Sequence, residues 1–421
     1  MREMKDSGIA WIGAMPRAWK MNTIAQIFLQ VKCKNTGLQE KNLLSLSYGK
    51  VKRKSIDTVE GLLPESFDGY NIIEKDDIVL RLTDLQNDHT SLRVGLAEER
   101  GIITSAYLTI RNRSNFCPKY LYYYLHSFDI AKGFYGMGAG VRQGLNWDGV
   151  KWLKILAPSV PEQERIAAFL DAECAEIDAV LEKTRASIEE YKKLKQAIIT
   201  QAVTKGIRGD MPMKDSGIEW IGEISQDFEI VKLKWLCDVL DQFRSPVTAD
   251  KRNQNADVLY DYYGASGAID KIDGYTIDDH VMLIGEDGAN LRMRNLPIMY
   301  EINGKAWVNN HAHILKPKAG VDFYFIFYAL EALDLNYYIT GSAQPKLSQD
   351  NLRNILVPIT DFIGQKRIAA YISDVCDEFD CLIAKKQQYL TEIENYKKSL
   401  IYEYVTGKRR CIRCDDSFKC C

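Results

Sequence analysis

Two long segments of the chain place apolar side chains in alternating steps of four and three residues. In the first segment this stripe comprises Leu170, Cys174, Ile177, Leu181, Thr184, Ile188, Tyr191, Lys195, Ile198 and Ala202. In the second it comprises, 202 residues later, Ile372, Cys376, Phe379, Ile383, Lys386, Leu390, Ile393, Lys397, Leu400 and Tyr404. Such spacing over more than four heptads is typical of the a/d seam of a coiled coil. The sequence therefore predicts two long helices that pair antiparallel through matching stripes.

The polar interruptions of the two stripes coincide. Thr184 corresponds to Lys386, and Lys195 corresponds to Lys397. A polar residue in a seam tends to fix the register of the helices at some cost in stability. The matched interruptions favour pairing of the two segments with each other. The alternative is that the helices pack on separate globular cores or on another chain.

The repeat extends far beyond the helices. The decapeptide MKDSGIAWIG at 4–13 returns as MKDSGIEWIG at 213–222. The stretch QERIAAFLDAECAEIDAVL at 163–181 returns as QKRIAAYISDVCDEFDCLI at 365–383. Self-similarity of this extent indicates a duplicated unit. The chain therefore consists of two similar halves, 1–209 and 210–421.

Each half is expected to contain a lead segment, a variable domain and a long helix. In the first half these are 1–13, 14–158 and 159–209. In the second half they are 210–222, 223–358 and 359–410, followed by a cysteine-rich tail at 411–421. A chain of 421 residues exceeds what one ordinary core holds, which agrees with several domains.

The variable domains show the pattern of compact α/β units. In the first, an apolar strand at 78–82 is followed by a strand at 101–111 and an aromatic helix at 118–127. In the second, the segments 280–290, 307–317 and 321–333 take the same roles. We predict an α/β (α+β) fold with two such domains, separated by the antiparallel two-helix coiled coil and related by an internal pseudo-twofold repeat.

The loops of the variable domains are rich in side chains that can read base edges. Arg, Asn, Gln, Ser and Thr supply the donors and acceptors that distinguish bases in a major groove, and a basic run suits phosphate contacts. In the first domain the expected DNA-binding residues are the basic run Lys50, Lys52, Arg53 and Lys54, and then Arg81, Thr83, Gln86, Asn87, Arg93, Ser105, Tyr107, Arg142, Gln143 and Asn146. In the second they are Gln242, Arg244, Tyr263, Ser266, Asn290, Arg292, Arg294, Asn309, Asn310, His311, Gln344 and Lys346. Any single polar loop is more often a solvated turn, so the prediction depends on the whole set.

Bulk composition narrows the class of protein. A net charge of −2 excludes a simple basic coat for nucleic acid, so DNA binding requires local patches or charge from a partner. No apolar run reaches about 18 residues and the N-terminus lacks a signal core, which predicts a cytoplasmic protein without a membrane span. The ten cysteines follow no framework spacing, as expected in a reducing compartment.

The sequence contains no recognisable catalytic equipment. None of the eleven prolines is adjacent to another, which argues against the paired-proline motif of adenine methyltransferases. There is no Walker A sequence, and GMGAG at 136–140 lacks the strand–turn–helix context of a cofactor loop. We therefore expect a non-catalytic chain with no cofactor of its own.

Two sets of residues raise the question of a metal site. Cys411 and Cys414 have zinc-like CxxC spacing, which Cys420 and Cys421 could complete, but a frayed terminus is the more frequent explanation of such a tail. His311 and His313 share one face of an expected strand, where base contact or packing is favoured over metal binding. We predict no metal site.

These features together resemble the specificity (S) subunit of type I restriction–modification systems over nearly the whole chain. The resemblance is carried by the paired leads and the paired helices. It is also carried by LTDLQNDHTSLRVGLAEERGIITSAYL in the first domain and YYGASGAID…LIGEDGAN…WVNNHAHIL in the second, which look like target-recognition domains of that family.

The resemblance implies a non-catalytic subunit that reads an asymmetric, bipartite target in double-stranded DNA. One domain would read each half-site, and the coiled coil would act as a ruler for the spacer. It further implies two modification (methyltransferase) subunits as partners, which use S-adenosylmethionine to methylate adenine, and it permits restriction (motor–nuclease) subunits in the same complex. The alternative is a coiled-coil scaffold that binds two protein partners without reading DNA sequence.

Overall fold

The chain divides into two units by its internal contacts. Unit 1 comprises Met1–Thr184 and Gln388–Cys421, and unit 2 comprises Arg185–Gln387. The computed structural model describes residues 2–54, 66–85, 88, 90–137, 144–219, 221–252 and 257–411. Within these described ranges, no helix is long and apolar enough to cross a membrane.

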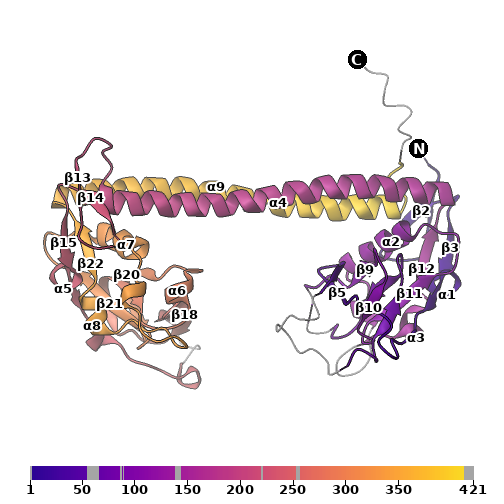
Figure 1. Cartoon of the computed structure of the whole chain (residues 1–421), viewed down its shortest axis with the longest axis horizontal. Helices are drawn as coiled ribbons and strands as arrows, with labels where there is room; N and C mark the ends of the chain where they lie inside the picture. Colours follow the sequence, from indigo (N-terminus) through magenta and orange to yellow (C-terminus); the bar gives the residue numbers. More distant parts are fainter. Residues whose placement is uncertain are drawn as a thin grey trace, which may run out of the picture. The chain divides into compact units, whose positions relative to one another are not determined.

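Two long helices contribute to both units. Helix α4 spans Val160–Lys205 and helix α9 spans Phe362–Val405. With 46 residues, α4 is about 69 Å long. In each unit, one half of α4 lies side by side with one half of α9 in the opposite direction (Figure 1). Rings from the facing helices meet, as in unit 2, where the centres of Tyr191 and Phe379 are 6.0 Å apart.

The apolar stripes of both helices face inward. Every position of the two predicted stripes is buried or half-buried, and Leu170, Ile372 and Leu400 are almost fully enclosed. The helices end at glycine, since Gly206 and Gly407 have φ values of 77° and 73°. This left-handed conformation is accessible to glycine without steric cost and forms a C-terminal cap. The two helices and their antiparallel pairing agree with the periodicity of the sequence.

Unit 1 is built around a four-stranded antiparallel sheet with the order β4–β11–β8–β9. Its strands are β4 (Phe28–Gln30), β11 (Leu108–Asn112), β8 (Ile78–Leu80) and β9 (Val94–Leu96). Helix α2 (Pro118–Ile130) lies between this sheet and the long helices (Figure 1). The sheet, α2 and the adjoining parts of α4 and α9 share one apolar core.

Shorter strand pairs and helices complete unit 1. The pairs are β1 (Met4–Asp6) with β2 (Ala14–Pro16), β3 (Lys20–Thr23) with β12 (Lys154–Ala157), β5 (Leu44–Ser47) with β6 (Lys50–Arg53), and β7 (Asn71–Ile73) with β10 (Gly101–Ile103). The helices are α1 (Ile24–Ile27), α3 (Trp147–Val150) and the 3-10 turn η1 (Tyr135–Met137).

Unit 2 contains a six-stranded sheet in which β17 and β20 are parallel and the other neighbours are antiparallel. Its order is β16 (Cys237–Val239), β21 (Ala312–Pro317), β19 (Ile277–Gly285), β20 (Met299–Val308), β17 (Tyr260–Gly264) and β18 (Gly267–Ile272). Two further pairs are β13 (Met213–Asp215) with β14 (Glu223–Ser225) and β15 (Glu229–Lys232) with β22 (Leu356–Ile359). The short helices are α5 (Leu233–Leu236), α6 (Asn290–Met293), α7 (Phe323–Ala332) and α8 (Gln349–Arg353), with 3-10 turns η2 (Asp241–Phe243), η3 (Ala249–Lys251) and η4 (Asn336–Tyr338).

The order of elements repeats between the units. The strand order β4–β11–β8–β9 of unit 1 matches β16–β21–β19–β20 of unit 2, and α2 matches α7. A buried hydrogen bond repeats as well. Gln163 accepts from Cys117 N over 2.9 Å, and Gln365 accepts in the same way from Asp322 N over 2.8 Å. The mixed α/β fold and the internal repeat are thereby confirmed.

One detail of the predicted strands is wrong in both units. The segments 101–111 and 307–317 are each divided by a turn, at residues 104–107 and 309–311. In the first turn Ala106 N donates to the Thr104 hydroxyl over 3.3 Å, and in the second His311 N donates to the Asn309 side chain over 2.7 Å. Such local bonds compete with a strand ladder. His311 therefore lies in a turn and does not share a strand with His313.

Candidate nucleic-acid interface

In unit 2 the expected recognition loops converge on Glu286, which directly follows β19. Glu286 N donates to His311 O over 2.9 Å, and Leu347 N donates to Glu286 O over 2.7 Å. Gly288 N donates to Pro345 O over 3.1 Å. Main-chain hydrogen bonds thus join the loops on either side of Glu286.

The carboxylate of Glu286 is shared by three basic side chains. Lys346 Nζ lies 2.9 Å from Oε1, Arg244 donates to Oε2, and His313 Nε2 lies 3.7 Å from Oε2. Burial alone would raise the pKa of Glu286, but hydrogen bonds from Lys346 and Arg244 outweigh it and hold the pKa below its ordinary value. Glu286 is therefore ionised at neutral pH and joins three segments electrostatically.

A second carboxylate supports the first. Asp241 Oδ2 lies 2.6 Å from His313 Nδ1 and accepts from Gln349 Nε2 over 2.9 Å, while Oδ1 accepts from Ile314 N over 3.0 Å. Burial would raise the pKa of Asp241, yet these hydrogen bonds, led by that of His313, lower it. His313 Nε2 donates to Leu347 O over 2.8 Å, so its ring is fixed at both nitrogens.

The loop at 262–267 joins the same end of the sheet. Asn309 N donates to Tyr263 O over 3.0 Å. Glycine at 285 makes this approach possible, because a Cβ there would lie 2.9 Å from Ala265 O. The segments that meet here are 241–247, 262–267, 286–294, 309–313 and 341–347.

The exposed residues of these loops form a polar edge. They are Gln242, Ser266, Arg292, Asn310, His311, Gln344 and Lys346. His311 Nδ1 lies 2.7 Å from Asp287, and Arg292 donates to Ile339 O over 3.1 Å, so both side chains have fixed directions. Donors and acceptors held in fixed positions are what base discrimination in a major groove requires.

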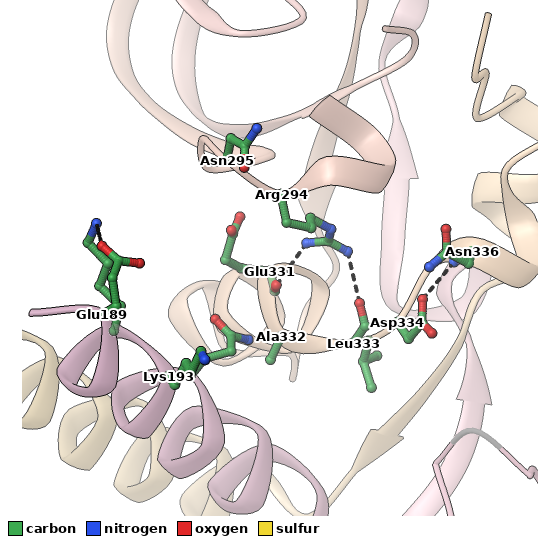
Figure 2. A pocket seen from close by; sticks show the side chains of 11 residues that line it. Glu189, Lys193, Arg294, Asn295, Glu331, Ala332, Leu333, Asp334 and Asn336 are labelled. Carbon is green, nitrogen blue, oxygen red and sulfur yellow. Dashed lines mark hydrogen bonds and ion pairs between the residues drawn. The ribbon is translucent and has the colours of Figure 1, made fainter. Parts of the chain in front are cut away.

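Arg294 does not belong to this edge. Figure 2 shows its guanidinium pointing at the end of α7, where it donates to Glu331 O over 3.0 Å and to Leu333 O over 2.9 Å. A cation at a helix C-terminus satisfies carbonyls that the helix leaves unpaired. Beside it lies a cleft of about 550 Å³, which reaches Glu189 and Lys193 of α4. Arg294 is therefore assigned a helix-capping role in place of the predicted DNA contact.

Asn290, Asn309 and Arg244 are also held within unit 2. The side chain of Asn290 closes its own loop by hydrogen bonds to Leu296 N and O, at 2.9 and 3.0 Å. Asn309 is buried, and Arg244 is engaged by Glu286 and by Asp241. These predicted contact residues shape the loops in this structure, and Tyr263 is half-buried among them.

Unit 1 has the apolar Leu82 where unit 2 has Glu286, because Leu145 N donates to Leu82 O as Leu347 N donates to Glu286 O. Arg81 directly follows β8, and β8 holds the sheet position that β19 holds in unit 2. Arg81 Nη2 lies 3.5 Å from Asp88 Oδ2, and hydrogen bonds from Ser91 keep the pKa of Asp88 well below its usual range. Arg81 is equivalent to Gly285, since Arg81 N donates to Arg93 O as Gly285 N donates to Ile298 O. The two loop clusters therefore differ in charge, because unit 2 has a carboxylate where unit 1 has leucine, and unit 1 has a guanidinium where unit 2 has glycine.

Arg93 anchors the loop that carries Arg81. Its side chain is fully buried and donates to the carbonyls of Arg81, Thr83 and Asp88 at 3.1, 2.8 and 2.5 Å. The planar guanidinium supplies several donors in a fixed fork, which suits this arrangement. The prediction that Arg93 contacts a base is corrected, because its donors hold the loop from inside.

Other candidates of unit 1 lie near this loop. Leu145 N donates to Leu82 O over 2.8 Å, so the segment before α3 is attached to it. Asn146 caps α3 by accepting from Gly149 N. Among the remaining candidates, Thr83 and Ser105 are exposed, Tyr107 is half-buried, and Gln86, Asn87, Arg142 and Gln143 lie outside the described residues.

Two of the four basic side chains in the run at 50–54 lie near carboxylates. Lys50 Nζ lies 3.7 Å from Asp178 of α4, and Arg53 Nε donates to Glu99 over 2.6 Å. Lys52 and Lys54 are exposed. Contact with phosphate therefore stays a prediction chiefly for Lys52 and Lys54, since the other two have carboxylate partners.

The sequence reasoning missed the acidic half of the unit 2 site. Glu286 and Asp241 were not among the candidates, although they hold Arg244, Lys346 and His313 in place. A signal existed, because Glu286 comes directly after the apolar run of β19, where a carboxylate falls at the edge of the sheet.

Metal ligation has no support among the residues that the structure describes. No group of three or more His, Cys, Asp or Glu residues there is placed to hold a metal ion. Cys411 Sγ lies 3.7 Å from Arg165 O. Cys414, Cys420 and Cys421 lie outside the described residues.

Comparison with known proteins finds similarity to type I restriction enzyme specificity subunits. Residues 225–394 match the family model for the type I restriction modification DNA specificity domain. The putative type I restriction enzyme MjaX specificity subunit of Methanocaldococcus jannaschii is 24% identical over 424 residues, covering 95% of each chain. The type I restriction enzyme MjaVIII specificity subunit of the same organism is 26% identical over 279 residues, covering 61% of this chain and 62% of that one. The chain is therefore similar over nearly its whole length to type I restriction–modification specificity subunits.

The specificity subunit fold also appears among solved structures. One chain, from work on complex assembly and conformational transition of the type I R-M system, has a TM-score of 0.70 at 14% identity. The match covers 94% of this chain and 99% of that chain. At this identity the likeness shows a shared fold. Specificity subunits of this family are in general DNA-binding and non-catalytic.

Proposed function

We propose that this specificity subunit reads an asymmetric, bipartite DNA target, with one half-site for each unit. The observation that carries the proposal is the difference between two equivalent loop clusters. Unit 2 gathers its loops around the Glu286 carboxylate, whereas unit 1 has Leu82 at the corresponding position and the basic Arg81 where unit 2 has Gly285. Loop clusters that differ in charge and in their exposed polar side chains suit different base edges.

In this proposal the long helices act as the ruler for the spacer between half-sites. The support is that α4 and α9 are each a single helix that contributes to both units and pairs with the other in each. Paired helices with a matched seam resist bending and sliding better than a loop. The length of unread DNA then depends on the number of helical residues.

The chemistry resides, in this proposal, in partner subunits. Two modification subunits bind the specificity subunit, take S-adenosylmethionine as their cofactor and methylate adenine, and restriction subunits join the same complex. The support is the duplication of the fold, because two equivalent surfaces fit two copies of one partner. The chain itself supplies sequence readout and positioning and no catalytic residue.

Methylation mapping tests target reading. DNA from cells that express the chain with its modification subunit is sequenced by a long-read method and compared with DNA from cells lacking the chain. The expected result is methylation at two dissimilar half-sites separated by a fixed spacer. A palindromic target would contradict the asymmetry, and methylation without sequence preference would favour the scaffold alternative.

A matched pair of substitutions tests the assignment of half-sites. Gln344→Ala in unit 2 and Thr83→Ala in unit 1 each remove an exposed polar side chain from one loop cluster. Each is expected to relax its own half-site alone, by about 1–3 kcal/mol of discrimination if a direct base contact is lost. Relaxation of the opposite half-site would overturn the assignment.

A further inference from the structure

Each unit carries a strongly exposed tryptophan beside a lysine. Trp152 in unit 1 is 67% exposed, and Trp235 in unit 2 is 66% exposed. Lys151 Nζ lies 5.6 Å from the ring centre of Trp152, and Lys234 Nζ lies 5.3 Å from that of Trp235. One exposed apolar side chain is ordinary on a protein surface. The informative feature is that the same arrangement occurs twice.

The two tryptophans lie at the same place in the fold of their units, although they come from positions that do not correspond in the two repeats. In unit 1, Ile24 N of α1 donates to Leu153 O over 3.0 Å, and in unit 2, Leu233 N of α5 donates to Ile355 O over 2.8 Å. The short helix therefore contacts the segment that follows α3 or α8 in the same way. Trp152 lies in that segment, whereas Trp235 lies in the helix itself.

The positions equivalent to the tryptophans carry amides. Gln26 stands in α1 where α5 has Trp235, and Asn354 stands after α8 where unit 1 has Trp152. Both amides serve local structure, since Gln26 accepts from Thr23 N over 2.7 Å and Asn354 donates to Asp350 O over 2.8 Å. Copying of one ancestral sequence would place tryptophan at the same position in both repeats. Duplication alone thus does not account for an aromatic residue that changes position and keeps its location.

Basic groups border both tryptophans. Arg113 donates to Ala25 O of α1, and Lys318 donates to Lys234 O, the equivalent carbonyl of α5. Carboxylates partly offset this charge, because Lys151 pairs with Asp148 over 2.5 Å in unit 1 and Lys318 lies 3.5 Å from an Asp238 oxygen in unit 2. The exposed indole with its lysine is the element common to both units.

This surface lies at the end of the sheet opposite the recognition loops. Strand β21 begins beside His311 and ends at Pro317, which pairs with Cys237, the first residue after α5. In unit 1, β11 ends at Asn112, which pairs with Phe28, the first residue after α1. The tryptophans are therefore separate from the proposed base-reading edge.

We propose that Lys151–Trp152 and Lys234–Trp235 are two copies of one docking surface for a protein partner that binds the two units equivalently. The partner presents an apolar pocket for the indole and carboxylates for the adjacent lysine. Tryptophan is among the side chains that most often anchor protein interfaces, and a neighbouring cation adds orientation. Two copies on one chain fit a partner present twice. The inference rests on the proposed function, under which this partner is the modification subunit.

Single and double substitutions test the surface in the full-length chain co-purified with the modification subunit. Trp152→Ala and Trp235→Ala are each expected to weaken the binding of one of the two modification subunits about tenfold or more. Analytical ultracentrifugation detects this as loss of one copy per chain. The double variant is expected to lose both copies. Lys151→Glu and Lys234→Glu should act in the same direction, and tryptophan to phenylalanine should retain most of the binding.

Two exposed aromatic residues elsewhere serve as controls. Tyr48 in unit 1 is 86% exposed and Tyr337 in unit 2 is 63% exposed. Alanine at either position should leave both modification subunits bound. Circular dichroism of every variant establishes that the chain is folded before binding is compared.

Two outcomes would overturn the docking surface. One is an unchanged stoichiometry and affinity in the double variant, and the other is a uniform loss of DNA affinity with intact assembly, which would assign the surface to the phosphate backbone. Gel shifts of the unaltered complex on selected and random duplexes test target reading independently of the docking surface. No sequence preference there would refute the proposed function, whereas preserved preference together with unaltered partner binding in the variants would refute the docking surface alone.

Discussion

Lys397 on α9 donates to Asp178 on α4 over 2.6 Å, and Lys195 makes the equivalent bond with Asp380 in unit 2 over 2.8 Å. The two lysines are one matched pair among the polar interruptions of the apolar stripes. Each reaches across the seam to a carboxylate of the facing helix, while its aliphatic part remains half-buried. A slip of one heptad would separate both pairs, so these lysines help to fix the register.

Removing one of these ion pairs should lower stability slightly. The Asp178 side chain is 40% exposed, so a double-mutant cycle on Lys397→Ala and Asp178→Ala is expected to give a coupling energy of about 0.2–1 kcal/mol. Urea unfolding at low and high salt measures it, and salt should reduce it. A coupling energy that salt leaves unchanged would contradict a solvent-screened pair.

Inserting one heptad into both long helices should lengthen the DNA spacer and leave the half-sites unchanged. Insertions after Thr184 in α4 and after Gln387 in α9 keep the seam in phase, because seven residues restore the a/d positions. Seven residues add about 10 Å, which corresponds to about three base pairs. Methylation mapping reads the new spacer. Insertion of four residues at the same points is the control that breaks the phase, and altered bases with the old spacer would refute the ruler.

Glu286→Gln should impair the second half-site alone. The substitution keeps the shape of the side chain and removes the charge that holds Arg244 and Lys346. The loops that meet there would then lose their fixed positions, and discrimination should fall by about 1–3 kcal/mol. Binding to targets with single base changes in each half-site measures this. Arg81→Gln is the matched variant for the first half-site, and equal effects of either variant on both half-sites would contradict two independent reading units.

Arg93→Lys should weaken reading of the first half-site although the residue is buried. Lysine keeps the charge but cannot reproduce the fork that reaches the carbonyls of Thr83 and Asp88. Leaving such groups unpaired should cost about 2 kcal/mol or more in the free energy of unfolding. Denaturant unfolding and half-site binding measure the two effects. Arg100→Lys, at an exposed surface pair, is the control and should change neither.

Two buried side chains of α2, Asp129 and His126, should change the stability of the fold in opposite directions as pH changes. Burial raises the pKa of Asp129 to about 6 and lowers the pKa of His126 to about 4. The folded state holds the Asp129 proton more tightly than the unfolded state, so this contribution to stability grows as pH falls from about 6 to about 4. The unfolded state protonates His126 first, so that contribution shrinks as pH falls below about 6.5. Each shift corresponds to about 3 kcal/mol, and the two largely cancel.

Single substitutions should expose each contribution. In Asp129→Asn only His126 is left, so stability should fall more steeply than in the unaltered chain between pH 6.5 and 4. In His126→Asn only Asp129 is left, so stability should rise relative to the unaltered chain over the same range. Thermal unfolding at stepped pH measures both, and slopes of the same sign would contradict this interpretation.

Periodicity alone was sufficient to predict the long helices and their pairing. An apolar stripe of that length must be buried, and the second repeat provides the matching stripe within the same chain. The roles of the loop arginines were not predictable in this way. Arg294 and Arg292 lie two positions apart in one loop, yet the first caps α7 and the second is exposed at the polar edge. Which role an arginine takes depends on carbonyls that lie far away in the sequence.

The carboxylates Glu286 and Asp241 illustrate the same limit of prediction from sequence. Arg244 and Glu286 are separated by 42 residues and meet because η2 and the end of β19 reach the same end of the sheet. The equivalence of Leu82 and Glu286 likewise becomes visible through strand register and the hydrogen bonds that their carbonyls accept, since the sequences around them differ. Composition pointed to loops that the fold of unit 2 brings together, while the fold determines which side chains hold the loops and which remain exposed.

The hydrogen bonds of Gln163 and Gln365 have an evolutionary consequence. The first bond attaches the start of α4 to the start of α2, and the second attaches the start of α9 to the start of α7. Both lie away from the recognition loops. Substitutions that accumulate in the loops of one unit therefore leave this fastening intact in both. Under the proposed bipartite reading, a lineage can acquire a new sequence preference through one unit while the other retains its inherited preference, so the repertoire of targets would diversify by changing one half at a time.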